Sequence, residues 1–381
     1  HVLARTEPPM STARLQVNLD ALARNFHRLR QRGVQSLPAD CAAAVVKANG
    51  YGLGMHMVAQ RLYHEGCRRF FVATATEGGL LRDLLPDVHI YVLAGVTRQT
   101  LGDLLAQRLT PVLNTRQQCE LWSTTPQAGS AALHIDTGMH RLGLSWDDDL
   151  SQLPALQLEL LMTHFARADE WSDALRPQQI GRLADCVTAL REVHPNALLS
   201  LNNSAAILAD QVTAESPLGG SEASRIDRLG IGLYGVNPHT EQEAAVAKQA
   251  LATVATLEGQ VLQVRRAKAG ATVGYGSTYC VSAPGRLVTI GAGYADGVPR
   301  LLSNQGHVFF QGRRLPIVGR VSMDSLVVEL TDESALACEI HEGDWVEIFG
   351  PHLPVEEGAQ QAQTIAYEAF TGLGSRLQRL S

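Results

Sequence analysis

The chain has 381 residues, of which 45% are hydrophobic and 18% are charged, and its formal net charge is -6. A chain of this length can bury a large core and can form more than one domain. Because its charges are mixed and no apolar stretch reaches membrane-spanning length, we expect neither a nucleic-acid partner nor a membrane partner.

Six cysteines are widely spaced, without a CxxC pair or a metal-ligand spacing. This distribution favours structural thiols in a reducing compartment, so we expect a cytoplasmic protein without a metal site. The first nine residues precede Met10 and lack the basic-then-apolar pattern of a signal peptide. We expect residues 1–9 to lie outside the fold.

Short apolar runs alternate with helix-like segments over the first two thirds of the chain. Eight runs predict strands, at residues 41–46, 70–74, 89–94, 110–113, 131–136, 157–163, 198–202 and 225–233. Segments with helical spacing, several opened by capping residues such as Thr76, Thr97 and Thr115, lie between them at 55–66, 77–85, 98–107, 115–123 and 176–193. Eight such units predict an α/β fold, an eight-stranded (β/α)8 TIM-like barrel over residues 10–246, with catalytic groups beyond the carboxyl ends of the strands.

After residue 246 the pattern changes to alternating, β-branched segments joined by glycine turns. These segments are Leu251–Val264, Arg286–Ile290, His307–Phe310, Leu315–Val318, Ser325–Leu330 and Asp344–Ile348. They predict a mainly β domain over residues 247–381, with one short helix around 355–369. The leading segment Leu15–Leu19 also alternates like a strand, and its pattern leaves open which domain it joins.

Lys47 stands where the apolar run Cys41–Val46 meets a turn that contains Gly50 and Gly52. Most lysines at strand ends are simply solvated. A run that is apolar throughout indicates a strand buried on both faces, so Lys47 would emerge at the rim of the core, where desolvation can lower its pKa. Such a lysine can form a Schiff base, and the carbonyl compound most often used with amino acids is pyridoxal phosphate.

The sequence also offers candidate residues for binding the phosphate and the pyridine ring of this cofactor. Barrel phosphate sites are commonly built after strands 7 and 8. There, Asn203-Ser204 offers a hydroxyl at a helix start and Gly230-Ile231 offers backbone amides, although Ser204 could equally be an ordinary helix cap. Arg228 could donate to the ring nitrogen and, because an arginine stays charged, keep that nitrogen unprotonated. As a lone arginine it would more often form a surface salt bridge.

Two further residues could carry protons. His164 ends a buried strand, where a histidine is more often structural than catalytic. Tyr275 lies between Gly274 and Gly276, at a turn that would expose its hydroxyl. A tyrosine is a poor base at neutral pH unless a positive neighbour lowers its pKa, and His164, hydrogen-bonded toward Arg228, could supply that effect.

Nine motifs together resemble the alanine racemase family of fold-type III pyridoxal-phosphate enzymes, over about residues 14–376. The matching stretches are Val45–Gly54, Asp136–Gly143, Thr163–Asp169, Asn203–Ala206, Arg228–Gly235, Gly274–Tyr279, Gly293–Gly297, Gly319–Asp324 and Tyr367-Glu368. The resemblance implies a barrel followed by a β domain, and a head-to-tail homodimer whose active sites are shared between subunits. It also implies interconversion of L-alanine and D-alanine, supplying D-alanine for the peptidoglycan of the bacterial cell wall.

The resemblance also implies roles for individual residues. Lys47 would be the Schiff-base lysine and one acid/base group, and Tyr275 of the partner subunit would be the other, acting on the opposite face of the substrate. His164 would link Arg228, the donor to the pyridine nitrogen, to Tyr275. The residues that would contact the cofactor phosphate are Tyr51, Ser204, Gly230, Ile231 and Tyr367.

The substrate, a small amino acid, has its own implied contacts. Its carboxylate would meet Arg141 and the backbone amide of Met323. The residues that would line its access corridor are Tyr294, Arg300, Arg320, Asp169 and Ile365.

One position departs clearly from the family pattern. Many members have a carbamylated lysine two residues before the aspartate of the Asp136–Gly143 motif, where this chain has His134. The carbamate is anionic and orients the carboxylate-binding arginine, whereas a neutral histidine can only hydrogen-bond to it. We expect Arg141 to be steadied by His134 alone or by a bound anion such as chloride. The residues His140, Arg167 and Asp227, which lie within or next to the matching motifs, are also less usual in the family.

Two alternative functions stay open. A serine or broad-specificity amino-acid racemase would differ in few pocket contacts, since discrimination between small side chains rests on only a few kcal/mol. A non-catalytic protein that only carries pyridoxal phosphate would explain Lys47 and Ser204, but not the β domain with Tyr275 and Met323. Related barrel decarboxylases fit less well, because the chain lacks a glycine-rich phosphate segment of their kind.

Overall fold

The computed structural model describes residues 11–32, 35–36, 39–170, 174–209, 225–239, 251–330 and 339–381, so the expectation for residues 1–9 lies outside the described part. The chain divides into two compact units, which we name the barrel unit (Leu19–Ala252) and the β unit (His1–Asn18 with Thr253–Ser381). Strand β1 (Ala13–Val17) pairs with β13 (Ala255–Ala267) and β21 (Gln378–Leu380). The leading segment therefore belongs to the β unit, and the expected ranges 10–246 and 247–381 differ from the two units at the amino terminus.

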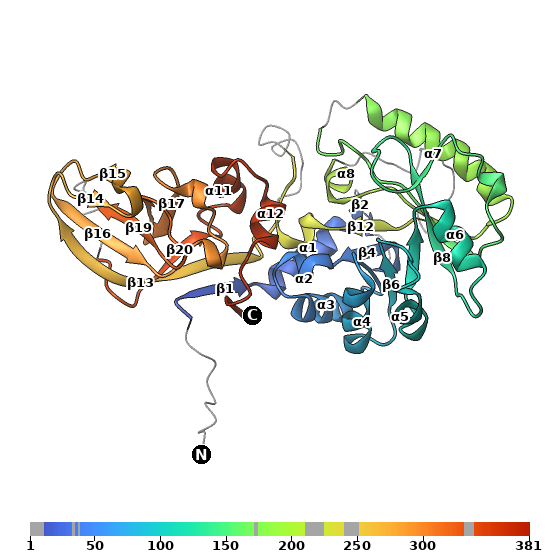
Figure 1. The fold of residues 1–381 in the computed structure, drawn as a ribbon, viewed down its shortest axis with the longest axis horizontal. Helices are drawn as coiled ribbons and strands as arrows, with labels where there is room; N and C mark the ends of the chain where they lie inside the picture. The colour runs from blue at the N-terminus through green and yellow to red at the C-terminus, as the bar shows by residue number, and fades with distance from the viewer. Residues whose placement is uncertain are drawn as a thin grey trace, which may run out of the picture. The chain divides into compact units, whose positions relative to one another are not determined.

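The barrel unit is built around eight parallel strands (Figure 1). In sheet order they are β11 (Leu198–Ser200), β10 (Leu158–Met162), β8 (Ala131–Asp136), β7 (Thr110–Leu113), β6 (His89–Val92), β5 (Arg69–Val72), β4 (Ala42–Val45) and β12 (Asp227–Leu229). A short strand, β9 (Leu144–Ser145), adds to β8. A parallel bridge between Leu199 and Arg225 joins the two ends of this order, which gives the expected barrel.

The burial of these strands explains why the sequence predicted them. Strand β4 is buried along its whole length, and β5, β6 and β7 leave the core only at their first residue. A parallel strand covered on both faces needs apolar side chains on both, so its sequence is a continuous apolar run. All eight predicted strands are present, but the run 225–233 is a strand only over β12 and continues as a 3-10 helix, Ile231–Tyr234.

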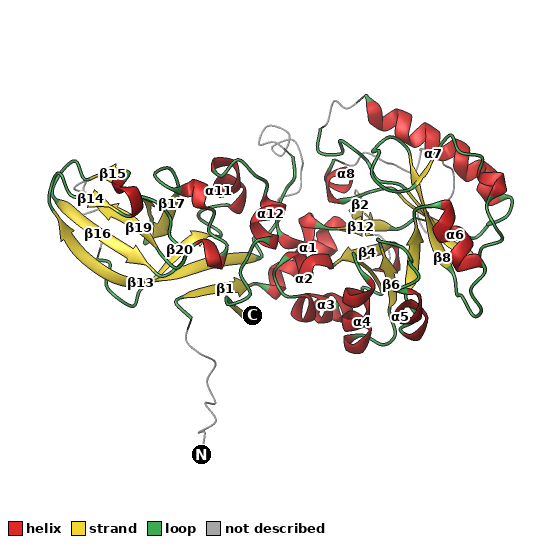
Figure 2. Ribbon diagram, in the orientation of Figure 1, coloured by secondary structure: helices red, strands yellow, loops and turns green. Residues whose placement is uncertain are grey.

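Helices alternate with the strands and lie outside the sheet (Figure 2). They are α1 (Leu19–Leu29), α3 (Met55–His64), α4 (Ala75–Leu84), α5 (Leu101–Ala106), α6 (Arg116–Ser123), α7 (Leu175–Arg191) and α8 (Ser204–Leu208). A two-stranded ribbon, β2 (Gln31–Arg32) with β3 (Gln35–Ser36), follows α1. Helix α5 starts later than expected because Thr97 and Thr100 exchange hydrogen bonds in the turn before it.

The amino-terminal cap of α6 is the predicted residue, whereas that of α4 is a different residue. The Thr115 hydroxyl accepts the amide hydrogen of Gln118 at 3.2 Å, so the predicted cap of α6 is confirmed. For α4 the prediction of Thr76 was wrong. The cap is Thr74, whose hydroxyl accepts the Glu77 amide at 3.2 Å while the Glu77 carboxylate accepts the Thr74 amide at 3.3 Å.

The β unit contains a mainly antiparallel sheet. Its strand order is β18 (Arg313–Pro316), β17 (His307–Phe310), β20 (Trp345–Phe349), β13, β1 and β21, while β16 (Gly285–Ile290) joins β13 to β19 (Leu326–Leu330). The single helix expected around 355–369 is two helices, α11 (Val355–Gln361) and α12 (Ala366–Thr371). Gln363 lies between them with a φ of 56°, a left-handed conformation that ends the first helix.

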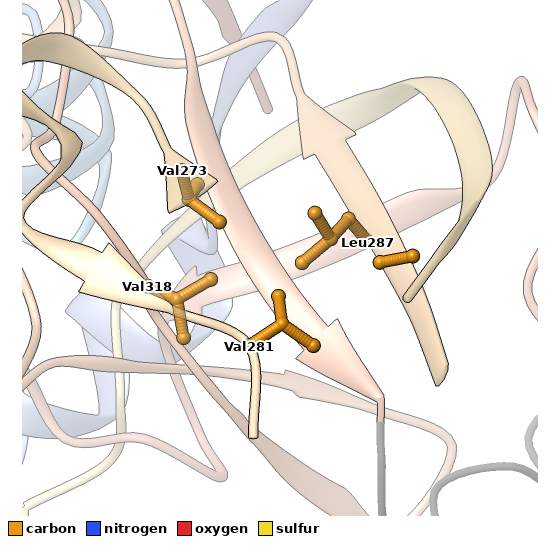
Figure 3. Close-up of a cluster of buried hydrophobic side chains, with 5 residues drawn as sticks. Val273, Val281, Leu287 and Val318 are labelled. Carbon is orange, nitrogen blue, oxygen red and sulfur yellow. The ribbon is translucent and has the colours of Figure 1, made fainter. Parts of the chain in front are cut away.

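A small apolar cluster supports the hairpin that carries Tyr275. The hairpin pairs β14 (Thr272–Val273) with β15 (Tyr279–Cys280). Val273, Val281, Leu287 and Val318 pack together beneath it (Figure 3), with Tyr279 against them. Within the described ranges, every helix is too short or too polar to serve as a membrane span.

Candidate active site

Lys47 follows β4 directly, at the start of a turn with unusual backbone geometry (α2, Lys47–Tyr51). Ala48 and Asn49 have φ values of 52° and 55°, in the left-handed region that non-glycine residues rarely adopt. Two side chains hold this turn: Glu77 accepts the Ala48 amide at 2.7 Å, and Asn49 accepts the Met55 amide at 2.9 Å. Strain that neighbouring groups hold in place is typical of functional positions.

The surroundings of Lys47 favour its neutral form. Burial lowers the pKa of its amine, the charges of Arg141 and Arg228 lower this pKa further, and the charge of Glu77 opposes them. A neutral amine is the form that attacks a carbonyl. The sequence-based prediction of a desolvated lysine at this strand end thus agrees with the structure.

Three groups, the Ser204 hydroxyl, the Tyr51 hydroxyl and the Ile231 amide, form a small polar cradle beyond β11 and β12. The Ser204 hydroxyl oxygen accepts the amides of Gly230 and Gly232 at 2.9 and 3.1 Å, which leaves its own proton for donation to a ligand. A Cβ atom at Gly230 would lie 2.8 Å from the Tyr51 hydroxyl oxygen, so only a glycine lets this hydroxyl approach so closely. Among the described residues, the amide of Ile231 has no hydrogen-bond partner. Hydroxyls and a backbone amide without a partner, gathered beyond the strand ends, suit a phosphate group.

The cradle also differs in two details from what the sequence indicated. Asn203, rather than Ser204, caps α8, since its side chain accepts the Ala206 amide at 3.0 Å. The Gly230 amide is not free, because the Ser204 hydroxyl accepts it.

Tyr51 lies on the ring of Tyr234, with ring centroids 4.6 Å apart, and the Tyr234 hydroxyl donates to the carbonyl of Val45 at 2.9 Å. Tyr234 therefore joins the cradle to β4.

Arg228 on β12 is buried inside the barrel unit, with 4% of its surface exposed. Its Nη1 donates to the Ser200 carbonyl and hydroxyl at 2.9 and 2.6 Å, and its Nη2 donates to the Thr163 carbonyl at 2.8 Å. Burial lowers its pKa to about 10, so it is charged at neutral pH. Within the described part of the chain its Nε has no hydrogen-bond partner. The surface salt bridge considered for this arginine is excluded by its burial.

Arg228 sets the tautomer of His164. Arg228 Nη2 lies 3.2 Å from His164 Nδ1. Because a guanidinium can only donate, Nδ1 must be the acceptor and the proton of the neutral ring lies on Nε2. Burial and the charge of Arg228 hold the pKa of His164 well below its usual value. His164 is therefore a neutral donor at Nε2, and not the positively charged neighbour that would act on Tyr275 by charge.

His134 is also neutral, with its acceptor nitrogen fixed. The Asn114 amide nitrogen donates to the carbonyls of Leu93 and Val112 at 3.0 and 2.8 Å, so the Asn114 oxygen faces His134 Nδ1 at 2.9 Å. That oxygen must accept, which places the proton on Nδ1 and the lone pair on Nε2. Burial, followed by the charge of Arg228, lowers the pKa of His134 to about 4.

The loop after β8 brings the charge of Arg141 close to these histidines. One oxygen of Asp136 accepts the amides of Gly138, Met139 and His140 at 2.9, 2.8 and 3.2 Å, which folds the loop back on itself. Arg141 follows this turn, and its charge lowers the pKa values of Lys47, His134 and His164. Arg141 therefore adds positive charge to the end of the barrel that holds Lys47 and the two histidines.

The predicted site residues in the β unit are Tyr275, Tyr294, Met323 and Tyr367, together with the corridor residues Arg300, Arg320 and Ile365. Tyr275 is 74% exposed, in a turn where Gly274 and Gly276 have φ values of 69° and 72°. Tyr294 and Met323 lie on adjacent loops and are 45% and 53% exposed, and Tyr367 is half-buried on α12. Within each unit, then, the structure brings together Lys47 with its turn, Ser204 with Gly230, Arg228 with His164, and Tyr294 with the loop of Met323.

Sequence reasoning missed three residues that organise the barrel site. Glu77 holds the Lys47 turn, Asn114 sets the tautomer of His134, and Ser200 binds Arg228. The spacing of Thr74 and Glu77 is a capping-box pattern that could have drawn attention to Glu77. The other two have no local signal, because their partners come from neighbouring strands.

Two family models match this chain. The N-terminal domain of alanine racemase matches residues 17–238, and the C-terminal domain of alanine racemase matches residues 254–381. The chain belongs to the alanine racemase family.

Named alanine racemases are similar over nearly the whole chain. The alanine racemase of Brucella abortus (strain 2308) is 37% identical, covering 96% of this chain and 92% of that protein. A catabolic alanine racemase of Agrobacterium fabrum (strain C58 / ATCC 33970) is 38% identical, covering 97% and 92%. The crystal structure of alanine racemase from Bartonella henselae, which has covalently bound pyridoxal phosphate, matches with a TM-score of 0.82 and 34% identity, covering 97% of this chain and 99% of that one.

Proposed function

We propose that this protein interconverts L-alanine and D-alanine with pyridoxal phosphate bound covalently to Lys47. The observation that carries the proposal is the set of groups at one end of the barrel: a lysine with a lowered pKa, a cradle suited to phosphate and a buried, charged arginine. The family supplies the reaction, since the relatives are alanine racemases, and the Bartonella henselae enzyme holds this cofactor covalently.

The residues of the site fit this cofactor. Tyr51, Ser204, Gly230, Ile231 and Tyr367 would hold its phosphate, and Gly230 provides the necessary space because it lacks a Cβ atom. Arg228 would donate Nε–H to the pyridine nitrogen and, as a charged donor, keep that nitrogen unprotonated. When bound, the cofactor supplies an electron sink for the electron pair left at the substrate Cα after its proton departs.

Two bases on opposite faces of Cα would invert its configuration. Lys47 would remove or return the proton on one face, and Tyr275 of the partner subunit would do so on the other. His164 Nε2–H would donate to the Tyr275 oxygen, so Tyr275 would be helped to lose its proton by a hydrogen bond instead of a charge. Arg141 and the Met323 amide would hold the carboxylate, and Tyr294 would line the approach of the substrate.

A head-to-tail homodimer completes this site in the proposal. Tyr275, Met323 and Tyr294 are large side chains with exposures between 45% and 74% in a single chain. Exposed apolar groups gathered on one unit are typical of a surface that another chain covers. We further propose that the enzyme acts in the cytoplasm, where its free cysteines would stay reduced, and that it supplies D-alanine for peptidoglycan.

Chiral analysis of products tests the reaction and its substrate range. Pyridoxal-phosphate-loaded protein is incubated separately with single enantiomers of alanine, serine, lysine and arginine. We expect alanine to be racemised far faster than the others, and Tyr275→Phe to lose most of this turnover while retaining the cofactor. Comparable rates for several amino acids would favour a broad-specificity racemase, and cofactor binding without any turnover would favour a carrier protein.

A further inference from the structure

Two loops of the β unit are joined through their backbones. One is the 3-10 helix η6 (Tyr294–Asp296), and the other is the segment 322–324 that contains Met323. The Tyr294 amide donates to the Ser322 carbonyl at 3.0 Å, and the Ala295 amide donates to the Met323 carbonyl at 3.0 Å. A Cβ atom at Gly293 would lie 2.3 Å from the Met323 carbonyl oxygen, so the two loops can approach this closely only with a glycine there.

These hydrogen bonds fix the direction of the Met323 amide. A peptide group is planar and trans, so the Met323 N–H points opposite to the Ser322 carbonyl. Because Tyr294 holds that carbonyl, the N–H is directed away from η6. Among the described residues this N–H has no hydrogen-bond partner, and Met323 is 53% exposed. It is an oriented donor available to a ligand.

One arginine ties the two loops together through their side chains. Arg376 Nε and Nη2 donate to the two oxygens of Asp296 at 2.7 and 2.9 Å, and Nη1 donates to Asp324 at 2.6 Å. Asp296 is 2% exposed and also accepts the Gly293 amide at 2.9 Å. Only a planar guanidinium can bind one carboxylate with two nitrogens and a second carboxylate with the third.

We propose that Arg376 is a positioning residue that holds the Met323 amide and Tyr294 in the arrangement that binds the substrate carboxylate. Asp296 fixes η6 to Arg376, and Asp324 fixes the residue that follows Met323. Without the guanidinium, each loop keeps its backbone bonds but loses the tie that sets their mutual position. This inference rests on the proposed function, in which the Met323 amide meets the carboxylate.

The test compares two arginine variants of the holoenzyme. Arg376→Gln removes the tie. Arg314→Gln is the matched control. Two nitrogens of Arg314 donate to the two carboxylate oxygens of Glu357 at 2.6 and 2.9 Å. The side chain of Arg314 is 48% exposed, and that of Arg376 is 47% exposed. Arg314 joins β18 to α11, and neither carries a proposed site residue. Steady-state kinetics with alanine are combined with inhibition by propionate, which has the carboxylate but no amine, and by 2-aminopropane, which has the amine but no carboxylate.

For Arg376→Gln we expect the KM for alanine and the inhibition constant of propionate to rise together, by about tenfold, the effect of weakening one hydrogen bond to a charged group. We expect inhibition by 2-aminopropane and the absorption of the bound cofactor to stay unchanged, and Arg314→Gln to leave both carboxylate constants at their wild-type values. An equal effect of both variants, or a propionate constant that Arg376→Gln leaves unchanged, would overturn the inference.

A second variant covers the case in which Arg376→Gln does not fold. Asp324→Asn keeps the ion pair of Arg376 with the buried Asp296 and weakens only the contact of Arg376 with residue 324. We therefore expect a smaller rise in the KM for alanine and in the inhibition constant of propionate. No rise would overturn the inference. Wild-type enzyme that fails to racemise alanine would remove the proposed function and this inference together, whereas active wild type with unchanged variants would remove this inference alone.

Discussion

At Gly230, the missing side chain is a condition of the proposed phosphate site. Its Cα faces the Tyr51 hydroxyl so closely that a Cβ would lie 2.8 Å from that oxygen. The Ser204 hydroxyl accepts the Gly230 amide at 2.9 Å. Any larger residue would therefore displace a hydroxyl that we assign to the cofactor phosphate.

We expect Gly230→Ala to weaken the binding of pyridoxal phosphate by at least about tenfold, since the displaced hydroxyl would lose a hydrogen bond to a charged group. The measurement is a titration of apo-enzyme with the cofactor. Gly102→Ala is the control, because nothing lies within 4 Å of a Cβ atom added at Gly102. Equal affinity for both variants would argue against a phosphate at Gly230.

His134 illustrates a residue whose protonation state follows from its neighbours. Its pKa in the folded protein is about 4, below the value of 6.5 that an exposed histidine has. Between these values an unfolded chain binds a proton that the folded chain does not bind, so stability is lost as the pH falls. The same neutrality leaves Nε2 as an acceptor that a cationic neighbour such as Arg141 can use.

We expect His134→Asn to reduce the acid sensitivity of the holoenzyme. Between pH 7.5 and pH 5 the free energy of unfolding should fall by about 2 kcal/mol less in this variant than in the wild type. Urea unfolding at the two pH values measures this difference. His56→Asn, at an exposed position on α3, is the control and should follow the wild type. Identical slopes for wild type and His134→Asn would contradict a neutral His134.

At the scale of single elements, the turn after β4 depends on the start of α4. The Glu77 carboxylate accepts the amides of Ala73 and Thr74 with one oxygen and that of Ala48 with the other. A glutamine has one acceptor oxygen, so it must turn an N–H toward a backbone N–H. The left-handed residues after Lys47 would then lose their support.

We expect Glu77→Gln to lower the free energy of unfolding by about 1 kcal/mol, the net contribution of one hydrogen bond to an amide that solvent can reach. The loss of its negative charge should also lower the pKa of Lys47 further, because Glu77 raises it. The pH midpoint for uptake of pyridoxal phosphate by apo-enzyme would move down. Glu120→Gln, at an exposed position on α6, should change neither quantity. A midpoint that stays in place would show that Glu77 does not act on Lys47.

Much of the fold could be predicted because local pattern and burial agree. The barrel strands are apolar on both faces, and the β-unit strands alternate, so each run in the sequence has a direct structural cause. The first strand could not be placed, since β1 pairs with β13 about 240 residues further along the chain. The break between α11 and α12 was also missed, because a left-handed Gln363 leaves no pattern in the sequence.

The candidate site was predictable in position but not in chemistry. Polar residues after buried strands indicate the catalytic end of a barrel, which singled out Lys47, His164 and Ser204. The tautomers of the two histidines could not be derived from sequence, because Arg228 sets that of His164 and Asn114 sets that of His134. The same holds for Arg376, whose partners lie about 50 and 80 residues away.

At the scale of the whole molecule, the proposal divides one active site between two chains. The barrel unit carries Lys47 and the proposed cofactor contacts other than Tyr367, and the β unit carries Tyr275 on an exposed turn. A single chain would then contribute Lys47 to one site and Tyr275 to another. Two chains with different defects could therefore complement each other.

Mixing two inactive variants tests this central claim most directly. Lys47→Ala and Tyr275→Phe are purified separately, combined under conditions that allow subunits to exchange, and assayed for alanine racemisation. If the site is shared, each mixed dimer has one of its two sites with both Lys47 and Tyr275 intact. At equal mixing, half of the dimers are mixed. We therefore expect activity to return to about a quarter of the wild-type value. Activity that stays at the level of the separate variants, although mixed dimers form, would contradict the account.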